Sequence, residues 1–189
     1  ITSVQVAAEK LIEITFIDVT EQYVKNQALS EIAFKDELTG LYNHRSFYQK
    51  LQEEVQQARQ EGGVLTLLFV DLDNFKQCND TFGHQVGDQL LRNVGQLVRD
   101  HIRQDRDSGF RYGGDEFAVL LPDAKANVAE RIANQVREGF ESIEQFGTSM
   151  SIGVAELKEG MDGDALVKAA DGALYAAKSA GKNTVCISQ

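Results

Sequence analysis

The sequence predicts an α/β fold of the α+β kind, in which helices flank a mixed central sheet of about five strands. Two observations support this fold class. Segments with strand periodicity and segments with helical periodicity alternate along most of the chain, which is typical of a sheet covered by helices. The exception is a pair of short apolar runs on either side of Gly113-Gly114, which is typical of a β-hairpin. A hairpin pairs its strands antiparallel, whereas helical crossovers allow other pairings, so we expect a mixed sheet.

The first elements come before residue 36. Residues 12–19 alternate apolar and polar side chains and predict a half-buried strand. Val24, Ala28 and Ile32 follow at four-residue spacing, so a helix is expected over residues 20–36. A lone strand is too small for a domain, so this helix is expected to connect two domains. The expected division is a terminal strand of a truncated domain at 1–19, a signalling helix at 20–35 and a main domain at 36–189.

The main domain continues the alternation. Its helical segments carry apolar side chains at three- and four-residue spacing, and its strand segments are short and apolar. Gly62-Gly63 is expected to end the first helix and Gly181 the last one. The expected helices are centred on residues 47–58, 86–98, 128–140 and 166–180, and the expected strands on 64–70, the two halves of 110–121, 148–155 and 184–187.

Composition and charge exclude several classes of protein. The chain has 189 residues, of which 42% are hydrophobic and 25% charged, so it can bury a core and is not expected to be disordered. The longest apolar run, residues 64–70, is far shorter than the roughly 20 residues of a membrane-spanning helix. A formal net charge of −10 argues against binding to a nucleic-acid backbone. We therefore expect no nucleic-acid partner and no membrane contact by this part of the protein.

The cysteine count and the start of the chain bear on location. Two cysteines are too few for a disulfide framework. The chain starts at Ile1 without the pattern of a secretory leader, so we expect it to be part of a longer protein. A cytoplasmic location is expected for this part, and membrane anchoring of the parent protein is left open.

Two acidic residues follow the apolar run at 64–70. Asp71 comes directly after it, and Asp73 comes two residues later. A strand that ends in a carboxylate delivers this group to the edge of the sheet, where main-chain N–H groups of the next turn can also bind phosphate. The alternative is that both residues only mark the strand end and cap the turn, which the pair alone does not exclude.

Two more acids stand at the predicted hairpin. Gly113 and Gly114 allow positive φ angles and the close approach of a ligand, and Asp115 and Glu116 follow at the chain reversal. The alternative is an ordinary glycine-rich hairpin with solvated acids. Two strand ends that each supply a carboxylate could, however, hold one or two Mg²⁺ ions through oxygen ligands. Such a site activates a hydroxyl and stabilises a leaving phosphate.

Several ordered motifs resemble those of one known family. Residues 113–117, Gly-Gly-Asp-Glu-Phe, match the signature of GGDEF-domain diguanylate cyclases. The resemblance covers the chain from about residue 30 to its C-terminus and implies a palm-like nucleotide cyclase architecture with the signature on a β-hairpin. Residues 12–21 are similar to the end of a PAS sensor domain. The other segments that resemble the family are 36–43, 71–76, 79–80, 83–88, 176–178 and 181–183.

The resemblance implies a reaction, a cofactor and a partner. Family members condense two GTP molecules into cyclic di-GMP and two pyrophosphates, and each subunit of a homodimer presents one GTP. The implied ligands of Mg²⁺ or Mn²⁺ are Asp71, the main-chain carbonyl of Leu72, and Asp115. Asp115 is also the implied general base, and Glu116 is the adjacent acid in the catalytic group. An upstream sensor domain is the implied source of control.

The resemblance also implies a set of substrate contacts. Asn79, His84 and Asp88 match positions associated with the nucleoside, and the Asp88 carboxylate can accept from N1–H and the exocyclic amine of guanine, which adenine cannot reproduce. Simpler alternatives stay open: Asp88 as a helix N-cap, His84 as a residue at a helix start, and lysines that only offset a helix dipole. The remaining implied substrate contacts are Asn74, Phe75, Lys76, Gly114, Lys178 and Lys182.

One segment departs from the family pattern. Members inhibited by their product carry Arg-x-x-Asp shortly before the glycine pair, and here this window runs from Gln104 to Asp107. Loss of the Arg removes a charged fork suited to guanine or phosphate, so we expect little product inhibition through this degenerate site. Arg103 could substitute only in part, because a shift of one position points it elsewhere. His44 also stands where many members have Arg.

Two other functions stay open from the sequence. One is a catalytically silent domain that binds GTP or cyclic di-GMP and regulates a partner, against which the intact Asp71, Asp115 and Glu116 argue. The other is nucleotidyl transfer with ATP or to a mixed dinucleotide, against which Asp88 argues. Our interpretation is a diguanylate cyclase domain that depends on Mg²⁺ or Mn²⁺ and on dimerisation.

Overall fold

The computed structural model describes residues 34–143 and 146–188. The strand expected at residues 12–19, the PAS-like segment and almost all of the helix expected at 20–36 lie outside these residues. At the start of the described chain, Lys35 pairs with Tyr42 in an isolated β-bridge. Asp36 closes the turn between them, since its Oδ1 accepts from the main-chain N–H of Thr39 at 2.9 Å. The domain therefore opens with a tight, hydrogen-bonded turn.

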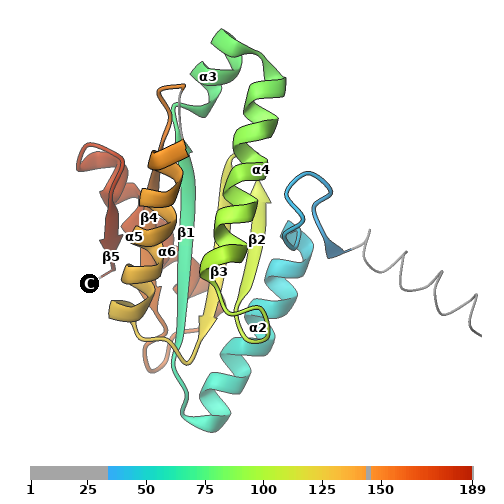
Figure 1. The fold of residues 1–189 in the computed structure, drawn as a ribbon. Helices are drawn as coiled ribbons and strands as arrows, with labels where there is room; N and C mark the ends of the chain where they lie inside the picture. Colours follow the sequence, from blue (N-terminus) through green and yellow to red (C-terminus); the bar gives the residue numbers. More distant parts are fainter. Residues whose placement is uncertain (1–33, 144–145, 189) are drawn as a thin grey trace, which may run out of the picture. The chain divides into compact units, whose positions relative to one another are not determined.

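The centre of the domain is one mixed, five-stranded sheet in the order β2-β3-β1-β4-β5 (Figure 1). Strand β1 pairs antiparallel with both β3 and β4, and β2 and β3 form the predicted hairpin. The edge strand β5 pairs parallel with β4. The predicted mixed sheet is thus confirmed. The strands are β1 (Leu65–Asp73), β2 (Ser108–Gly113), β3 (Glu116–Pro122), β4 (Ser149–Glu156) and β5 (Val185–Ile187).

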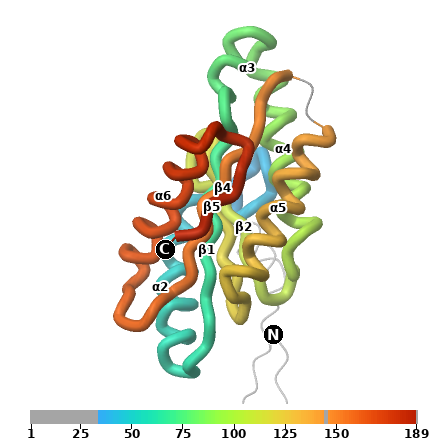
Figure 2. Tube along the Cα trace, turned by 90° about the vertical axis from the view of Figure 1, so that its left-hand side faces the viewer, coloured from blue at the N-terminus to red at the C-terminus, as the bar shows by residue number. Residues whose placement is uncertain are grey.

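Helices cover both faces of this sheet. Figure 2 shows α2 (His44–Glu61) and α6 (Gly163–Ser179) on one side of the strands, and α4 (His84–His101) and α5 (Ala126–Ile143) on the other. Each pair of helices closes its own apolar cluster against the sheet. Within residues 34–143 and 146–188, none of the helices combines the length and the apolar character that crossing a membrane requires. The four helices predicted from apolar periodicity are confirmed.

Strand β1 is buried on both faces, and its alternation decides where the acids lie. Leu67 and Phe69 belong to the cluster under α2 and α6, whereas Val70 belongs to the cluster under α4 and α5. Successive side chains of a strand point to opposite faces. Asp71 and Asp73 therefore continue the row that faces α2 and α6.

Gly153 on β4 lets α6 approach the sheet closely. A Cβ at this position would lie 2.2 Å from the carbonyl oxygen of Ala170 and 2.3 Å from the main-chain nitrogen of Leu174. Main-chain atoms of a helix cannot move aside as a flexible side chain can. The absence of a side chain at Gly153 thus sets the distance between α6 and the sheet. Lys178 lies in the last turn of this helix.

Among the residues that the structure describes, one helix was not predicted by the sequence analysis. Helix α3 (Phe75–Phe82) lies between β1 and α4, after Asn74 at φ 61° and before Gly83 at φ 87°. Phe75, Cys78 and Phe82 stand at i, i+3 and i+7, but the helix has only eight residues and Cys78 is its one buried residue, so the periodic pattern is short. Strand β1 also extends three residues beyond the predicted end, to Asp73, because this acidic tail still pairs with β4.

Candidate functional site

Two acid-bearing segments meet at one end of the sheet. Strands β1 and β3 run antiparallel, and the terminal pair of their ladder joins Asp71 to Glu116. The main-chain N–H of Leu72 also donates to the carbonyl oxygen of Asp115 at 3.3 Å. Because β1 ends where β3 begins, acids from two separate sequence motifs share one place. The structure thus brings together Asp71, Asp115 and Glu116 at this end of the sheet.

These carboxylates act on one another electrostatically. Burial raises the pKa of Asp71 above its ordinary value, and the charges of Asp115 and Asp73 raise it further, while Lys178 opposes the shift. Burial also raises the pKa of Glu116, and the charges of Asp71 and Asp115 add to this effect. Half-buried acids that repel one another are stabilised in their charged form by a nearby cation. The site is therefore suited to bind positive charge.

One cation of the protein already lies at the acids. Nζ of Lys178, in the last turn of α6, is 2.8 Å from Oδ2 of Asp71. The side chain of Lys178 is 37% exposed and that of Asp71 13%, so this ion pair lies at the rim and not in the core. An anionic ligand at the sheet end can therefore reach Lys178 directly.

A second lysine reaches the start of α3. Nζ of Lys182 donates to Oδ1 of Asn74 at 2.8 Å. Asn74 stands at the N-cap of α3, and its side chain makes no capping hydrogen bond there. The first N–H groups of α3, which include those of Phe75 and Lys76, are not capped by this side chain, and helix N-termini bind phosphate well. The predicted phosphate contacts thus gather beside the acids.

The predicted nucleoside residues lie where α3 meets α4. Asn79 is on α3, and His84 and Asp88 are in the first two turns of α4. Oδ1 of Asn79 is buried and has no hydrogen-bond partner among the described residues. A Cβ at Gly87 would lie 1.9 Å from this oxygen, so any larger residue there would displace the Asn79 side chain. A buried acceptor without a protein partner can accept a donor from an ordered water or from a ligand.

The structure also decides one of the alternatives. Helix α4 begins at His84, after the N-cap Gly83, so Asp88 lies in its second turn and is not an N-cap. The N-cap alternative for Asp88 is therefore wrong. His84 is the first residue of α4 and is exposed, which fits both a helix-start residue and a ligand contact.

Comparison with known proteins assigns this arrangement to a family. The family model described as diguanylate cyclase, GGDEF domain, matches residues 33–184. The chain belongs to the GGDEF family of diguanylate cyclases. The family predicted from the sequence motifs is thus confirmed.

Two curated relatives of this GGDEF domain are named diguanylate cyclases. The diguanylate cyclase DgcS of Shewanella oneidensis is 41% identical over 160 residues, which are 83% of this chain and 53% of DgcS. The diguanylate cyclase DosC of Escherichia coli is 40% identical over 157 residues, 79% of this chain and 34% of DosC. The chain thus spans about half of the first relative and a third of the second.

Solved structures share the fold. The coiled coil and GGDEF domain of DgcB from Caulobacter crescentus, in complex with c-di-GMP, superposes with a TM-score of 0.84 at 31% identity, covering 90% of this chain and 93% of that one. The diguanylate cyclase SiaD of Pseudomonas aeruginosa, in complex with its activator SiaC, gives 0.78 at 32% identity, covering 89% and 69%. These likenesses agree with the five-stranded sheet and its flanking helices.

The oxygen atoms at the acids of this GGDEF domain fit a hard divalent cation. Within the described ranges, no group of three or more His, Cys, Asp or Glu side chains has the arrangement of a metal centre. Two carboxylates and the main-chain carbonyl of Leu72 remain as donors, and Mg²⁺ typically takes one or two carboxylates with water and phosphate oxygens as its other ligands. The mutual repulsion of Asp71 and Asp115 also favours such a cation. The predicted ligands therefore fit Mg²⁺ or Mn²⁺ chemically.

The segment from Gln104 to Asp107 lies beside an internal ion pair. Nη2 of Arg103 lies 2.6 Å from Oδ1 of Asp107 and also donates to the carbonyl oxygen of Pro122 at 2.6 Å. The side chain of Asp107 is fully buried beneath it. Gln104 and Asp107 line a hollow of about 240 Å³, and Arg103 does not. The guanidinium of Arg103 is engaged by Asp107 and by the carbonyl oxygen of Pro122.

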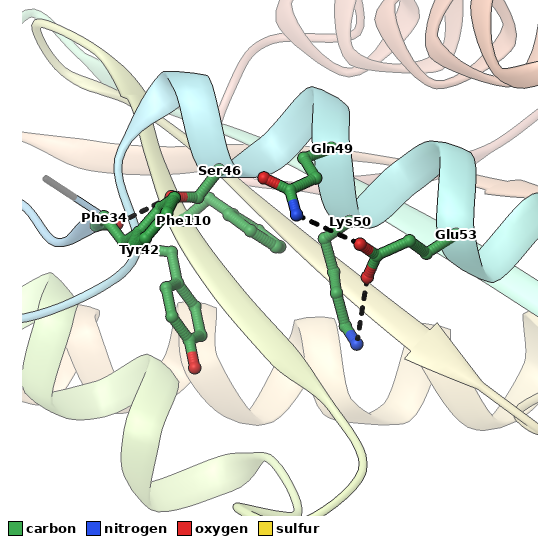
Figure 3. A pocket seen from close by; sticks show the side chains of 7 residues that line it. All are labelled: Phe34, Tyr42, Ser46, Gln49, Lys50, Glu53 and Phe110. Carbon is green, nitrogen blue, oxygen red and sulfur yellow. Dashed lines mark hydrogen bonds and ion pairs between the residues drawn. The ribbon is translucent and has the colours of Figure 1, made fainter. Parts of the chain in front are cut away.

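A separate hollow lies beside the edge strand β2 (Figure 3). Lys50 on its wall pairs with Glu53 at 3.8 Å and with Glu54 at 3.2 Å, so its charge is offset within the protein. Asp71, Asp115 and Glu116 do not line this hollow, so it is separate from the acids at the sheet end. The hollow measures about 230 Å³ and is lined by Phe34, Tyr42, Ser46, Gln49, Lys50, Glu53 and Phe110.

Arg111 was not predicted at the site, and Asp73 was noted beside Asp71 without a role of its own. Arg111 donates from Nη2 to the carbonyl oxygen of Gly114 at 2.8 Å and from Nη1 to Oδ2 of Asp36 at 3.1 Å. It therefore ties the signature hairpin to the first turn of the domain. Asp73 is buried beside Asp71 and accepts hydrogen bonds from β4. The sequence signal was present for both, because each stands inside a motif, but nothing in periodicity shows such contacts.

Proposed function

We propose that this domain is a diguanylate cyclase that condenses two GTP molecules into cyclic di-GMP and two pyrophosphates. The observation that carries the proposal is the pairing of Asp71 with Glu116 at the end of the β1–β3 ladder, which places Asp115 beside them. The membership of the chain in the GGDEF family supports the same reaction.

Each half of the reaction forms one bond and breaks one. The 3′-hydroxyl oxygen of one GTP attacks the α-phosphorus of the other, and the bond from this phosphorus to the pyrophosphate oxygen breaks. The hydroxyl proton passes to Asp115, which is the acid assigned as general base. Glu116 adds negative charge beside it. Repetition of the step with exchanged roles closes the ring.

The charges of the chain fit these steps. Asp71, Asp115 and the carbonyl of Leu72 would hold Mg²⁺ or Mn²⁺. When bound, the metal supplies positive charge that lowers the pKa of the hydroxyl and stabilises the leaving pyrophosphate. Lys178, Lys182 and the first N–H groups of α3 would bind the β- and γ-phosphates.

Guanine specificity is assigned to the contact between α3 and α4. The carboxylate of Asp88 would accept from N1–H and the exocyclic amine of guanine, and Oδ1 of Asn79 would accept a further donor of the nucleoside. His84 and Gly114 would complete the set of substrate contacts. The buried, unpartnered oxygen of Asn79 supports this assignment.

Dimerisation completes the site in this proposal. One domain presents one GTP, so attack on a second α-phosphate needs the facing domain of a homodimer. The helix proposed at residues 20–35 would pair the two copies and transmit the state of an upstream sensor domain, whose last strand would be residues 1–19. We place the domain, residues 36–189, in the cytoplasm.

Product identity tests the proposal. The purified chain is incubated with GTP and Mg²⁺ at concentrations where light scattering finds a dimer, and the nucleotides are separated by chromatography. Cyclic di-GMP from GTP, with no cyclic dinucleotide from ATP, is the expected result. A dimer that binds GTP and forms no product would overturn the proposal in favour of a silent regulatory domain.

A further inference from the structure

The buried carboxylate of Asp73 is held by donors from two distant segments. Oγ of Ser151 lies 2.9 Å from both carboxylate oxygens, and Oγ of Ser149 donates to Oδ2 at 2.8 Å. The main-chain N–H of Asn183 donates to the same Oδ2 at 3.2 Å. The residue is 3% exposed. Protein donors therefore surround both oxygens of Asp73, in contrast to the accessible carboxylate of Asp71.

Asp73 is hydrogen-bonded to the turn at residues 181–183, which has an unusual conformation. Gly181, Lys182 and Asn183 have φ angles of 116°, 66° and 48°, so three successive residues have positive φ. Residues other than glycine adopt such angles only where the surrounding structure holds them. The side chain of Asn183 is fixed as well, by Nη1 of Arg137 at 3.1 Å and by Oε1 of Glu141 at 3.1 Å.

This turn carries a cation of the candidate site. Lys182 lies between Gly181 and Asn183, and its Nζ donates to Oδ1 of Asn74 at 2.8 Å. Asn74 follows Asp73 directly and precedes the N-terminus of α3. The adjacent residues Asp73 and Asn74 therefore both contact the turn. Asp73 accepts from the main chain of Asn183, and Asn74 accepts from the side chain of Lys182. The distance between the lysine and the N–H groups of α3 is fixed by this double link.

We propose that Asp73 is a positioning residue for triphosphate binding, which acts by holding the turn at residues 181–183 so that Lys182 faces the start of α3. The inference rests on the proposed function, because it takes GTP as the ligand. It assigns to Asp73 neither metal coordination nor proton transfer. The ligand part that depends on Asp73 is the β- and γ-phosphates.

The proposal predicts a change in triphosphate affinity that is opposite to the change expected from charge alone. Replacing Asp73 with Asn removes a negative charge near a triphosphate, which by charge alone leaves binding unchanged or strengthens it. If Asp73 positions Lys182, the same change weakens binding, because the new amide NH₂ faces donors and releases the turn. Asp171→Asn is the matched control. Asp171 is exposed on α6, and its charge acts on Glu116.

The test measures binding by calorimetry with two probes that cannot react. One is 3′-deoxy-GTP with Mg²⁺, which lacks the attacking hydroxyl, and the other is GMP, which lacks the β- and γ-phosphates. For Asp73→Asn we expect at least about tenfold weaker binding of 3′-deoxy-GTP, with GMP unchanged. Asp171→Asn should bind both probes as the unmodified chain does. In a Lys182→Ala background, Asp73→Asn should add little, because both act through one contact.

The outcomes separate this inference from the proposed function. An unmodified chain that binds neither probe would contradict the proposed function itself. Normal binding of 3′-deoxy-GTP by Asp73→Asn, or an equal loss of both probes, would overturn the positioning role. Ser149→Ala removes one donor to Asp73 and serves if Asp73→Asn does not fold. Ser149→Ala should weaken the binding of 3′-deoxy-GTP and leave the binding of GMP unchanged. An unchanged ratio of the two affinities would also overturn the positioning role of Asp73.

Discussion

Nζ of Lys178 lies 2.8 Å from Oδ2 of Asp71, which joins the C-terminal end of α6 to the end of β1. The two residues are far apart in the sequence, and the close packing of α6 on Gly153 brings them together. Burial, and then the charges of Asp115 and Asp73, raise the pKa of Asp71, and the lysine offsets part of this shift. A phosphate that binds at the acids therefore meets a cation that is already in place.

Replacing Lys178 with Met should weaken GTP binding by about 10- to 100-fold, since a hydrogen bond to a charged phosphate contributes about 1.5–3 kcal/mol. The free energy of unfolding should change by less than about 1 kcal/mol, because the ion pair lies at the rim. Calorimetric titration with 3′-deoxy-GTP and urea unfolding measure the two effects. Lys168→Met, at an exposed position of the same helix, is the control and should change neither. Undiminished affinity in Lys178→Met would contradict the assigned contact.

Replacing Gly153 with Ala should lower the free energy of unfolding by about 1–3 kcal/mol or more, because the new Cβ meets main-chain atoms of α6. Gly172→Ala is the matched control on α6, since a Cβ there has no atom within 4 Å. It should raise the free energy of unfolding by about 0.5–1 kcal/mol, because alanine favours the helix. Urea unfolding of both variants tests this pair of opposite signs, and equal effects would refute the packing argument.

The ion pair between Asp36 and Arg111 should make stability depend on pH. Burial alone would raise the pKa of Asp36, but hydrogen bonds from Thr39 and the charge of Arg111 outweigh it, so the pKa is lowered. A lowered pKa stabilises the fold above the ordinary value of about 4, and this contribution is lost as the pH falls through the folded-state pKa. Asp36→Asn should therefore have a lower free energy of unfolding than the unmodified chain at pH 7. At a pH below the folded-state pKa of Asp36, the two proteins should be equally stable. Urea unfolding at these two pH values measures the difference, and a difference that does not change with pH would contradict the role of the charge.

Replacing Arg103 with Met should lower the free energy of unfolding by about 1–3 kcal/mol, because the buried carboxylate of Asp107 loses its charged partner. The control is Arg92→Met, at an exposed position on α4. Thermal unfolding of the two variants distinguishes a structural Arg103 from a surface charge. A midpoint equal to that of the control would show that the pair contributes nothing.

Cyclic di-GMP should inhibit this domain only weakly through the segment from Gln104 to Asp107. Gln104 lacks the guanidinium that binds guanine or phosphate, and Asp107 is held by Arg103. The initial rate of pyrophosphate release should be the same with and without added cyclic di-GMP at a concentration equal to that of GTP. A clear fall in rate would mean that another product site operates.

Much of the fold was predictable because apolar periodicity follows burial. The helix at His84–His101 was predicted from its buried stripe, and β1 from a run that is buried on both faces. Helix α3 was missed although Phe75, Cys78 and Phe82 stand at helical spacing, because it has only eight residues. A segment of about two turns is shorter than the window in which helical periodicity can be recognised.

The candidate site was predictable in its residue types and in part in its geometry. The family motifs named Asp71, Asp115 and Glu116, and strand pairing brings them together. The hydrogen bond between Asp73 and the main chain of Asn183 was not predictable. It depends on the register of β1 with β4 and on the positive φ angles of residues 181–183. Such contacts join segments that the linear sequence gives no reason to connect.

A single-turnover comparison of Asp115→Ala with the unmodified chain tests the central claim most directly. Both proteins are brought to a concentration where they are dimeric and bind 3′-deoxy-GTP equally in the presence of Mg²⁺, and cyclic di-GMP is then measured after addition of GTP. The account predicts rapid formation of cyclic di-GMP by the unmodified chain and a loss of at least about 100-fold in Asp115→Ala. Equal rates in the two proteins, at equal binding, would contradict the claim that the carboxylates at the β1–β3 end perform the reaction.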